Sequence, residues 1–365
     1  MSTQQGSAAS SGAGSTRAHG QPLRVVAIGG GTGLSTLLKG LKRYVPAPGT
    51  VRSAQPTEPV IHELSAIVTV SDDGGSSGRL RKEFNMLPPG DIRNCIVALS
   101  EDEALLSRLF QHRFSKGSGL EGHSFGNLFL TALTSITSDF AEAVRLSAEI
   151  LFTRGHIFPA TTSNVELEAL MEDGTRVRGE TKITASKGRI KELVLVPPDV
   201  QPLSQTLEAI ATADLITIGP GSLFTSLIPN LLVRGIPQAI VDSPATKVFV
   251  CNLMTQANES LGLTAADHIR ALNQHAGGRI FDYALINRTA VSLELKAKYA
   301  LEGASQIVAD LDRIEAQGVC PVLGDYLEEA GAARHATDQV ARDLIALVTQ
   351  SPDIQKIAPN GAVSR

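Results

Sequence analysis

The first patterned segment runs from a strand through a glycine-rich turn into a helix, and this order restricts the fold more than any other feature. Residues 23–28 form an apolar, mostly β-branched run, and four glycines fall within residues 29–33. Leucines then recur at helical spacing from Leu34 to Leu41 and predict one buried helix face. A strand that passes directly into a helix through glycine is typical of parallel α/β sheets.

The alternation of strands and helices continues along the chain. Apolar runs predict strands at residues 64–70, 190–196, 215–218, 239–241, 248–250 and 283–286. Helical periodicity predicts helices at residues 91–99, 103–110, 126–136, 141–150 and 341–348, and another after Ser222. Between residues 160 and 198 the apolar period shortens to two, and Asp173-Gly174 marks a hairpin turn between residues 165–171 and a return strand at 175–183. The prediction is an α/β, Rossmann-like, doubly wound, mostly parallel sheet with a small antiparallel β-hairpin insert.

We divide the chain into one folded region and two tails. Residues 1–22 are rich in Ser, Gly, Ala, Gln and Thr and lack the apolar stretch of a signal peptide, so a disordered tail is expected. Residues 23–350 are expected to form a single domain that carries the insert around residues 160–198. Residues 351–365 are expected to form a C-terminal tail.

Composition excludes several functional classes. The net charge is −4 and aromatic residues make up 4% of the chain, which argues against nucleic-acid binding. Cys95, Cys251 and Cys320 lie far apart, which excludes a disulfide scaffold or zinc ribbon and favours a cytoplasmic protein. No apolar run reaches the roughly 18 to 20 residues of a membrane span.

Three loops rich in glycine and serine follow predicted strands, at the sheet edge where α/β proteins bind ligands. Free N–H groups at a following helix would favour an anion there, so three such loops predict a phosphate-bearing ligand. The first loop lacks the dinucleotide fingerprint because Leu34 stands where a glycine is required, and no Walker motif occurs. The predicted ligand contacts are Gly30, Gly31, Thr32 and Gly33; Ser71, Asp72, Asp73, Gly74 and Gly75; and Gly219, Pro220, Gly221 and Ser222.

Carboxylates directly follow the second predicted strand. Of Asp72 and Asp73, one could accept ribose hydroxyls and the other could hold Mg²⁺ against a diphosphate. The alternative is an Asx turn with solvated carboxylates. Asp91 is predicted to be the N-cap of the helix at 91–99, and Arg93 could clamp a phosphate or could be an ordinary surface arginine.

His123 and Asn127 stand four residues apart and could face one site, although a lone histidine is as often structural. Asn94 is a further candidate, as is Asn164 at the end of a polar cluster that could equally be turn chemistry. No HExxH and no cysteine with an evident histidine partner occurs, so catalysis by a cysteine nucleophile is unsupported. Asp72 and Asp73 are the only candidates for a catalytic role.

Seven blocks of the sequence resemble the YvcK family of gluconeogenesis factors, which is related to the CofD-like 2-phospho-L-lactate transferases. The resemblance runs in order from about Leu23 to the C-terminal helix. The blocks are VVAIGGGTGLSTLLKGLK, AIVTVSDDGGSSGRLR, LPPGDIRNC, GHSFGNLFL, TTSNVELEALMEDG, GPGSLFTSLIPNL and KVFVCNLMTQANES.

The resemblance implies a Rossmann-like core with a nucleotide-type ligand at the strand ends. YvcK-like proteins are bacterial and cytoplasmic, are associated with UDP-sugars, notably UDP-N-acetylglucosamine, and are linked to cell shape and to growth on gluconeogenic carbon sources. They are not established as enzymes. Their transferase relatives move a phospholactyl group onto a deazaflavin precursor with Mg²⁺, and an acidic loop at the position of Asp72 and Asp73 lies near the reacting phosphates.

The leading hypothesis is therefore a cytoplasmic nucleotide-sugar-binding regulator without an established cofactor. The first and third glycine loops would hold the diphosphate or nucleotide, and Asp72, Asp73, Asp91, Arg93, His123 and Asn127 would line the sugar side. A Mg²⁺-dependent transferase that uses the same site is the first alternative. An NAD-dependent oxidoreductase is weakened by the broken fingerprint. Protein partners in cell-wall synthesis and a homo-oligomer are expected.

Overall fold

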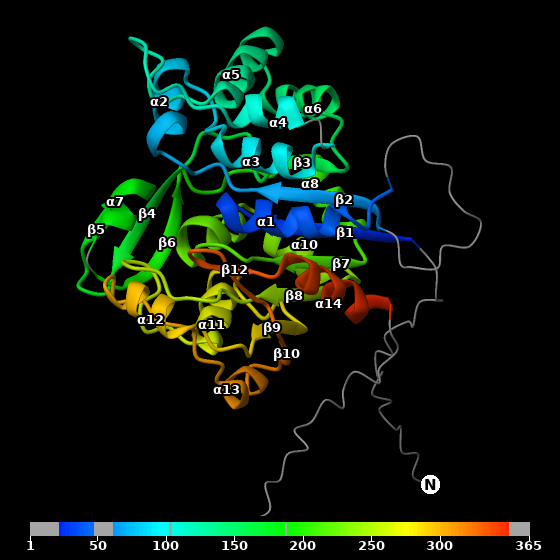
Figure 1. The fold of residues 1–365 in the computed structure, drawn as a ribbon, viewed down its shortest axis with the longest axis vertical. Helices are drawn as coiled ribbons and strands as arrows, with labels where there is room; N and C mark the ends of the chain where they lie inside the picture. The colour runs from blue at the N-terminus through cyan, green and yellow to red at the C-terminus, as the bar shows by residue number, and fades with distance from the viewer. Residues whose placement is uncertain (1–21, 47–60, 102–103, 187, 350–365) are drawn as a thin grey trace, which may run out of the picture.

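Seven parallel strands form the central sheet of the computed structural model, which describes residues 22–46, 61–101, 104–186 and 188–349 (Figure 1). The strands are β1 (Leu23–Gly29), β2 (Ile61–Val68), β3 (His156–Pro159), β7 (Leu215–Ile218), β8 (Thr246–Val250), β9 (Tyr283–Asn287) and β10 (Cys320–Gly324). They lie in the order β10-β9-β8-β7-β1-β2-β3. All four residues of β7 are buried, as a strand covered on both faces requires.

Helices cover both faces of this sheet. On one face lie α1 (Gly31–Lys42), α3 (Gly90–Leu99) and α14 (Thr337–Thr349), with α1 packed between the other two (Figure 1). On the other lie α8 (Ser204–Thr212), α10 (Ile236–Asp242) and α11 (Ala265–His275). The leucine stripe of α1 is buried throughout, so apolar burial explains its helical spacing.

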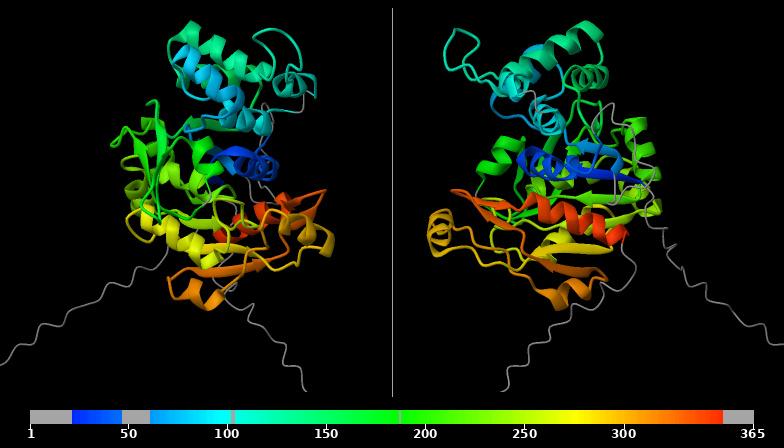
Figure 2. Two further views of the ribbon diagram at one scale, coloured as in Figure 1. Left: turned by 90° about the vertical axis from the view of Figure 1, so that its left-hand side faces the viewer. Right: turned by 45° about the vertical axis from the view of Figure 1, so that its right-hand side comes forward.

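Two smaller groups extend from the sheet. Beyond its β3 edge stand α2 (Gly75–Phe84), α4 (Ala104–Gln111), α5 (Phe125–Thr137) and α6 (Phe140–Ile150), which both views of Figure 2 show together. The second group is an antiparallel sheet in the order β5-β4-β6, formed by β4 (Glu166–Met171), β5 (Arg176–Arg178) and β6 (Ile190–Val196), with α7 (Glu180–Ala185) beside it. Buried and half-buried residues alternate along β4, as expected for a sheet with one covered face.

The remaining elements complete the carboxyl edge of the sheet. They are the π-helical turn η1 (Leu223–Leu227), α9 (Ile228–Leu231), α12 (Leu293–Ala300), α13 (Leu311–Glu315), β11 (Leu327–Glu329) and β12 (Ala333–His335). Strand order reverses at β1, because the chain first adds β2 and β3 on one side and later adds β7 on the other. The gap between the ends of β1 and β7 is therefore the topological switch point, where open α/β sheets bind ligands.

The predicted fold class is confirmed, but three predicted segments are wrong. Residues 239–241 belong to α10 and are not a strand, because Gly235 in the left-handed region and Pro237 start a helix that buries Ile236 and Ile240. The return strand at 175–183 is only β5, because Gly179 adopts a φ of +100° and α7 follows. The loop at 71–77 becomes helical at Gly75, where α2 begins.

The two predicted tails and the proline-rich segment at 47–60 lie outside the described residues, apart from Pro22 at the end of the first tail. None of the helices in the described part of the chain combines the length and the apolar character that a bilayer span requires.

Candidate functional site

A cavity of about 620 Å³ opens where β1 and β7 end, and we call it the glycine cavity. It is lined by Gly30–Gly33, Asp72, Asp91, Glu180, Thr184, Pro220–Ser222, Thr225, Ser226, Asn252–Gln256, Tyr299, Ala333 and His335. The first and third predicted loops thus share one cavity with one carboxylate of the second loop. Its size is that of a small-molecule site.

Backbone contact between two loops forms the floor of the glycine cavity. A Cβ atom at Gly33 would stand 2.2 Å from the Pro220 carbonyl oxygen, so the loops approach at a distance that only glycine permits. The Asn252 amide fixes the third loop, because its Oδ1 accepts from the Gly221 N–H at 3.0 Å and its Nδ2 donates to the Gly221 carbonyl at 2.7 Å. The floor is therefore formed before any ligand arrives.

The N-terminus of α1 faces the cavity with little side-chain cover. Its N-cap residue, Gly30, supplies no side-chain cap, and Gly31 adopts a φ of +61° with 3.6 Å between an added Cβ and the nearest atom. The Gly31 N–H hydrogen-bonds to the Asp91 carboxylate. The helix dipole and the remaining N–H groups of the first turn favour a negatively charged group at this end of the cavity.

The η1 turn differs from the N-terminus of α1, because the first N–H groups of η1 already have an acidic partner. Glu259 Oε1 accepts from the N–H of Phe224 at 3.1 Å and from that of Thr225 at 2.9 Å. Gln256 donates from Nε2 to Ser222 Oγ at 2.9 Å, while its buried Oε1 has no hydrogen-bond partner among the described residues. Gln256 is part of the cavity wall, and an unpartnered buried acceptor in such a wall is uncommon in folded proteins.

Carboxyl groups gather on the opposite wall. Burial, reinforced by the charge of Asp72, raises the pKa of Asp91 to about 6, against the lowering influence of the Gly31 N–H and Arg93. Burial also raises the pKa of Glu180 well above its usual value, with Asp72 and Asp91 adding to the effect. Ser71 Oγ donates to Glu180 Oε2 at 3.1 Å. Both acids are therefore protonated more readily than ordinary carboxyl groups, and a protonated carboxyl group can donate a hydrogen bond.

The two aspartates of the second loop have different positions. Asp72 lines the cavity, and its Oδ1 accepts from the Gly74 N–H at 2.8 Å, which is the predicted Asx turn. Asp73 does not line the cavity. Its Oδ1 accepts from the Thr181 N–H at 2.8 Å and from Thr181 Oγ1 at 2.5 Å, so it caps α7.

Arg93, Asn94, His123 and Asn127 do not line the glycine cavity. The Arg93 guanidinium donates to Ser124 Oγ, to Asn127 Oδ1 at 3.2 Å and to Asn94 Oδ1 at 2.6 Å. His123 Nδ1 shares a hydrogen bond with Ser76 Oγ at 2.9 Å, and burial and Arg79 lower the pKa of this histidine. These residues form a buried network that joins α2, α3 and α5 behind the cavity.

One local prediction in this region is wrong. Asp91 is not an N-cap, because α3 begins at Gly90 and Asp91 turns into the cavity wall. His123 lies just before α5, which begins at Phe125 with Ser124 as its N-cap, and Ser76 contacts the side chains of both His123 and Asn127. Of the other predicted contacts, Ser71, Gly74, Gly75 and Gly219 lie outside the lining, and Asn164 is within 3.5 Å of Asn85 instead.

Several residues that line the glycine cavity were not predicted from the sequence. Asn252 and Gln256 follow β8 directly, so the rule that selects residues at strand ends could have found them. His335 donates from Nε2 to the Cys251 carbonyl at 3.0 Å, and burial lowers its pKa to about 4, so it is neutral. Glu180, Tyr299 and His335 come from the insert, α12 and β12, and no local pattern marks them.

Among the described residues no cluster of three His, Cys, Asp or Glu side chains could hold a metal ion alone. Mg²⁺ is commonly held by one or two carboxylates together with substrate phosphates and water. Asp72 and Asp91 both line the cavity near the first loop, so they fit that limited role, whereas Asp73 does not.

Comparison with known proteins gives one consistent result. The sequence model of the family described as 2-phospho-L-lactate transferase CofD matches residues 25–327. The chain is 48% identical over 323 residues to a gluconeogenesis factor of Halalkalibacterium halodurans, which covers 88% of this chain and 95% of that protein. It is 46% identical to the gluconeogenesis factor of Bacillus subtilis, over 91% of this chain and 100% of that protein. A crystal structure of a UPF0052 family member from Bacillus halodurans superposes with a TM-score of 0.82 at 47% identity, covering 89% of this chain and 99% of that one.

Proposed function

The chain belongs to the YvcK-type branch of the CofD family, and on that premise we propose that its glycine cavity binds a nucleotide sugar of the UDP-N-acetylglucosamine type. One observation carries the proposal. Two glycine loops meet backbone to backbone at the switch point between β1 and β7, next to the open N-terminus of α1. This arrangement suits a diphosphate.

The rest of the cavity suits the uncharged parts of such a ligand. The diphosphate would lie against Gly31–Gly33 and Gly221. The Asp91 and Glu180 carboxyl groups and the Gln256 amide would exchange hydrogen bonds with hydroxyl and amide groups. Within the described residues no Lys or Arg lines the cavity, so phosphate binding there would depend on backbone N–H groups and on protonation of the acids.

The proposed role is that of a cytoplasmic factor that couples nucleotide-sugar supply to carbon metabolism. The names of the relatives support a part in growth on gluconeogenic carbon sources. Effects on cell shape, protein partners in cell-wall synthesis and a homo-oligomeric state extend the same proposal. We treat residues 23–350 as one domain with an antiparallel insert.

A thermal-shift panel tests the ligand class. UDP-N-acetylglucosamine, NAD and ATP are each added without Mg²⁺, and a ligand at about 100 times its Kd stabilises the fold by about 2.7 kcal/mol. UDP-N-acetylglucosamine is expected to raise the melting temperature more than NAD or ATP. A panel in which NAD stabilises the protein most would overturn the proposal in favour of a dinucleotide enzyme.

A Mg²⁺-dependent transferase is the second candidate, and the Asp72 and Asp91 carboxylates beside the first loop favour it. Bound Mg²⁺ would neutralise phosphate charge and activate the group being transferred. Long incubation of the wild type with UDP-N-acetylglucosamine and Mg²⁺, followed by chromatography, separates the two functions. The regulator hypothesis expects no turnover. Catalytic formation of UMP, UDP or a transferred sugar that is lost in Asp72→Asn would establish the transferase.

A further inference from the structure

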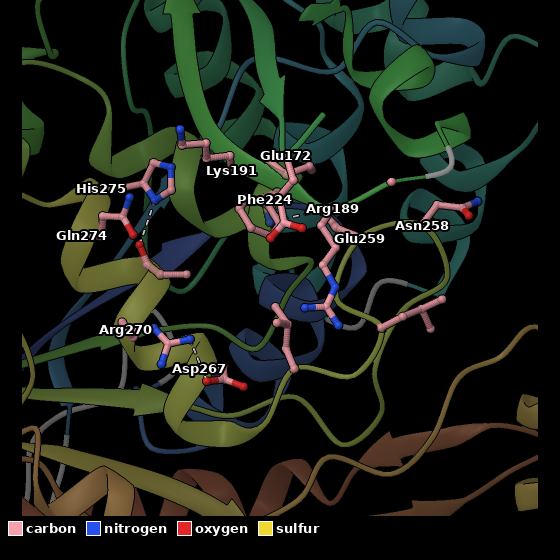
Figure 3. A pocket seen from close by; sticks show the side chains of 15 residues that line it. Glu172, Arg189, Lys191, Phe224, Asn258, Glu259, Asp267, Arg270, Gln274 and His275 are labelled. Atoms are coloured by element: carbon pink, nitrogen blue, oxygen red, sulfur yellow. Dashed lines mark hydrogen bonds and ion pairs between the residues drawn. The ribbon is translucent and has the colours of Figure 1, made fainter. Parts of the chain in front are cut away.

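A second cavity of about 600 Å³ lies between the antiparallel insert and α11, and we call it the insert cavity (Figure 3). Glu172, Arg189 and Lys191 approach it from the insert, and Asp267, Arg270, Gln274 and His275 from α11. Phe224 of η1 and the segment around Glu259 complete its walls. Its lining shares no described residue with that of the glycine cavity.

The walls of the insert cavity are fixed by a neutral histidine. His275 Nε2 accepts from the Leu193 N–H at 3.1 Å, and its Nδ1 donates to the Ala271 carbonyl at 2.8 Å. Its ring also meets Phe224 edge-on, with centroids 6.2 Å apart. Burial lowers the pKa of His275, so the ring stays neutral and ties β6, α11 and η1 together. The cavity is thus a built feature and not a gap between mobile parts.

Positive charge in the insert cavity is left without internal partners. No hydrogen bond or ion pair engages the Arg189 guanidinium or the Lys191 ammonium in the described part of the chain. The acidic residues are mostly occupied, because Asp267 pairs with Arg270 and Arg313 at 2.8 Å each and Glu259 accepts the two η1 N–H groups. Glu172 is the remaining acidic side chain, so the lining as a whole has three basic and three acidic groups, and only Arg189 and Lys191 among the basic ones have no partner in the described part of the chain.

The lining also offers an apolar surface. Phe224, Leu261, Leu263 and Ile190 contribute to it, and Phe224 and Ile190 are buried. Arginine and lysine beside an aromatic floor suit an anion that carries an apolar or planar body. Phosphate esters and carboxylates share that chemistry.

We propose that the insert cavity is a second binding site, for a small organic phosphate or carboxylate with an apolar body. Arg189 binds its anionic group, Lys191 adds positive charge from the opposite end of the cavity, and Phe224 packs against its body. Binding there acts on η1, because Phe224 faces the insert cavity while its neighbours Thr225 and Ser226 line the glycine cavity. The site therefore reports a metabolite to the glycine cavity; this last step rests on the proposed function.

Direct titration with simple probes tests the site itself. Phenyl phosphate, benzoate and benzyl alcohol are titrated into the full chain by saturation-transfer NMR. The two anions are expected to bind, and the uncharged alcohol to bind at least about tenfold more weakly. The stronger of the two anions identifies a phosphate or a carboxylate site. Failure of both anions to bind, or equal binding of the alcohol, overturns the proposal.

Charge-removing variants locate the probe. Arg189→Gln with Lys191→Gln is expected to weaken phenyl phosphate binding at least about tenfold. Lys182→Gln with Lys296→Gln is the matched control, because both lysines are exposed and line neither cavity. The control is expected to bind as the wild type does. Equal loss in both double variants, or none in the first, contradicts the assignment whether or not a nucleotide sugar binds elsewhere.

A separate measurement tests whether binding in the insert cavity changes ligand affinity in the glycine cavity. The affinity for UDP-N-acetylglucosamine is measured with and without saturating phenyl phosphate. A change of at least about threefold in the wild type that disappears in Arg189→Gln with Lys191→Gln supports transmission through η1. An unchanged affinity in the wild type shows that the insert cavity does not act on the glycine cavity. Whether the insert cavity binds an anion is then decided by the titrations above.

Discussion

Asp91 is a half-buried carboxylic acid in the wall of the glycine cavity, where its charged form is unfavourable. Its pKa of about 6 in the folded chain exceeds the ordinary value of 3.8. The native state therefore keeps a proton that the unfolded chain releases between about pH 4 and pH 6. Stability is lost as the pH rises through this window, and the penalty is fully present above it. A half-buried acid that costs stability at neutral pH is typical of a functional site.

Asp91→Asn removes this penalty while its amide oxygen can still accept from the Gly31 N–H. The variant is expected to be more stable than the wild type at pH 7.5, by roughly 1–3 kcal/mol. The difference should nearly vanish at about pH 3, where the wild-type acid is mostly protonated in both states. Chemical denaturation at the two pH values measures it. A variant that is less stable at pH 7.5 would show that the carboxylate is a structural group.

Asp72 and Asp73 are neighbours with separate tasks, and the same substitution distinguishes them. Asp72→Asn is expected to weaken UDP-N-acetylglucosamine binding by about 1–3 kcal/mol, because its carboxylate lines the glycine cavity. Asp73→Asn is expected to leave affinity unchanged and to lower stability by about 0.5–1.5 kcal/mol, because it weakens the cap on Thr181. Calorimetric titration and denaturation provide both values. A larger affinity loss in Asp73→Asn would reverse the two roles.

At the scale of elements, the contact between the first and third loops fixes the glycine cavity. Gly33→Ala would bring a Cβ against the Pro220 carbonyl, so the loops must separate. We expect a loss of stability above about 2 kcal/mol. Gly278→Ala is the control, because an added Cβ there meets no atom within 4 Å. Similar denaturation midpoints for the two variants would mean that the loops are not held together as described.

Strong periodic patterns predicted most elements, and weak ones did not. The leucine stripe of α1 and the apolar run of β7 both reflect deep burial, so sequence alone identified them. The edge strands β3 and β10 have four and five residues with partly exposed side chains, and each contains a proline, so no run marks them. Residues 239–241 could not be assigned by pattern, because so short an apolar run fits strand or helix.

The sequence likewise predicts some residues of the candidate site and not others. The glycine loops follow strands whose order along the chain sets their place, so sequence could locate them. Glu180 and His335 reach the cavity from the insert and from β12, which depends on tertiary packing. Arg93 and His123 were selected for their chemistry, but their hydrogen bonds with Ser124 and Ser76 join helices behind the cavity. Residue type alone could not distinguish the residues that line the glycine cavity from those that join the helices around it.

At the scale of the whole molecule, one turn separates two cavities. The glycine cavity lies at the switch point of the parallel sheet, and the insert cavity lies where the antiparallel sheet meets α11. Both touch η1, whose N–H groups are held by Glu259. The antiparallel insert thus contributes walls to both cavities, through Glu180 to one and through Arg189 and Lys191 to the other.

The central claim is that the glycine cavity binds a nucleotide sugar at the N-terminus of α1. Calorimetric titration with UDP-N-acetylglucosamine, without Mg²⁺, tests it on the wild type, Gly31→Ala and Gly235→Ala. Both glycines have a positive φ with room for a methyl group, at +61° and +83°, so their strain is similar, but only Gly31 lines the cavity. The account predicts one binding site in the wild type and in Gly235→Ala, with affinity at least about tenfold lower in Gly31→Ala. Equal affinity in all three proteins, or no binding to the wild type, would contradict it.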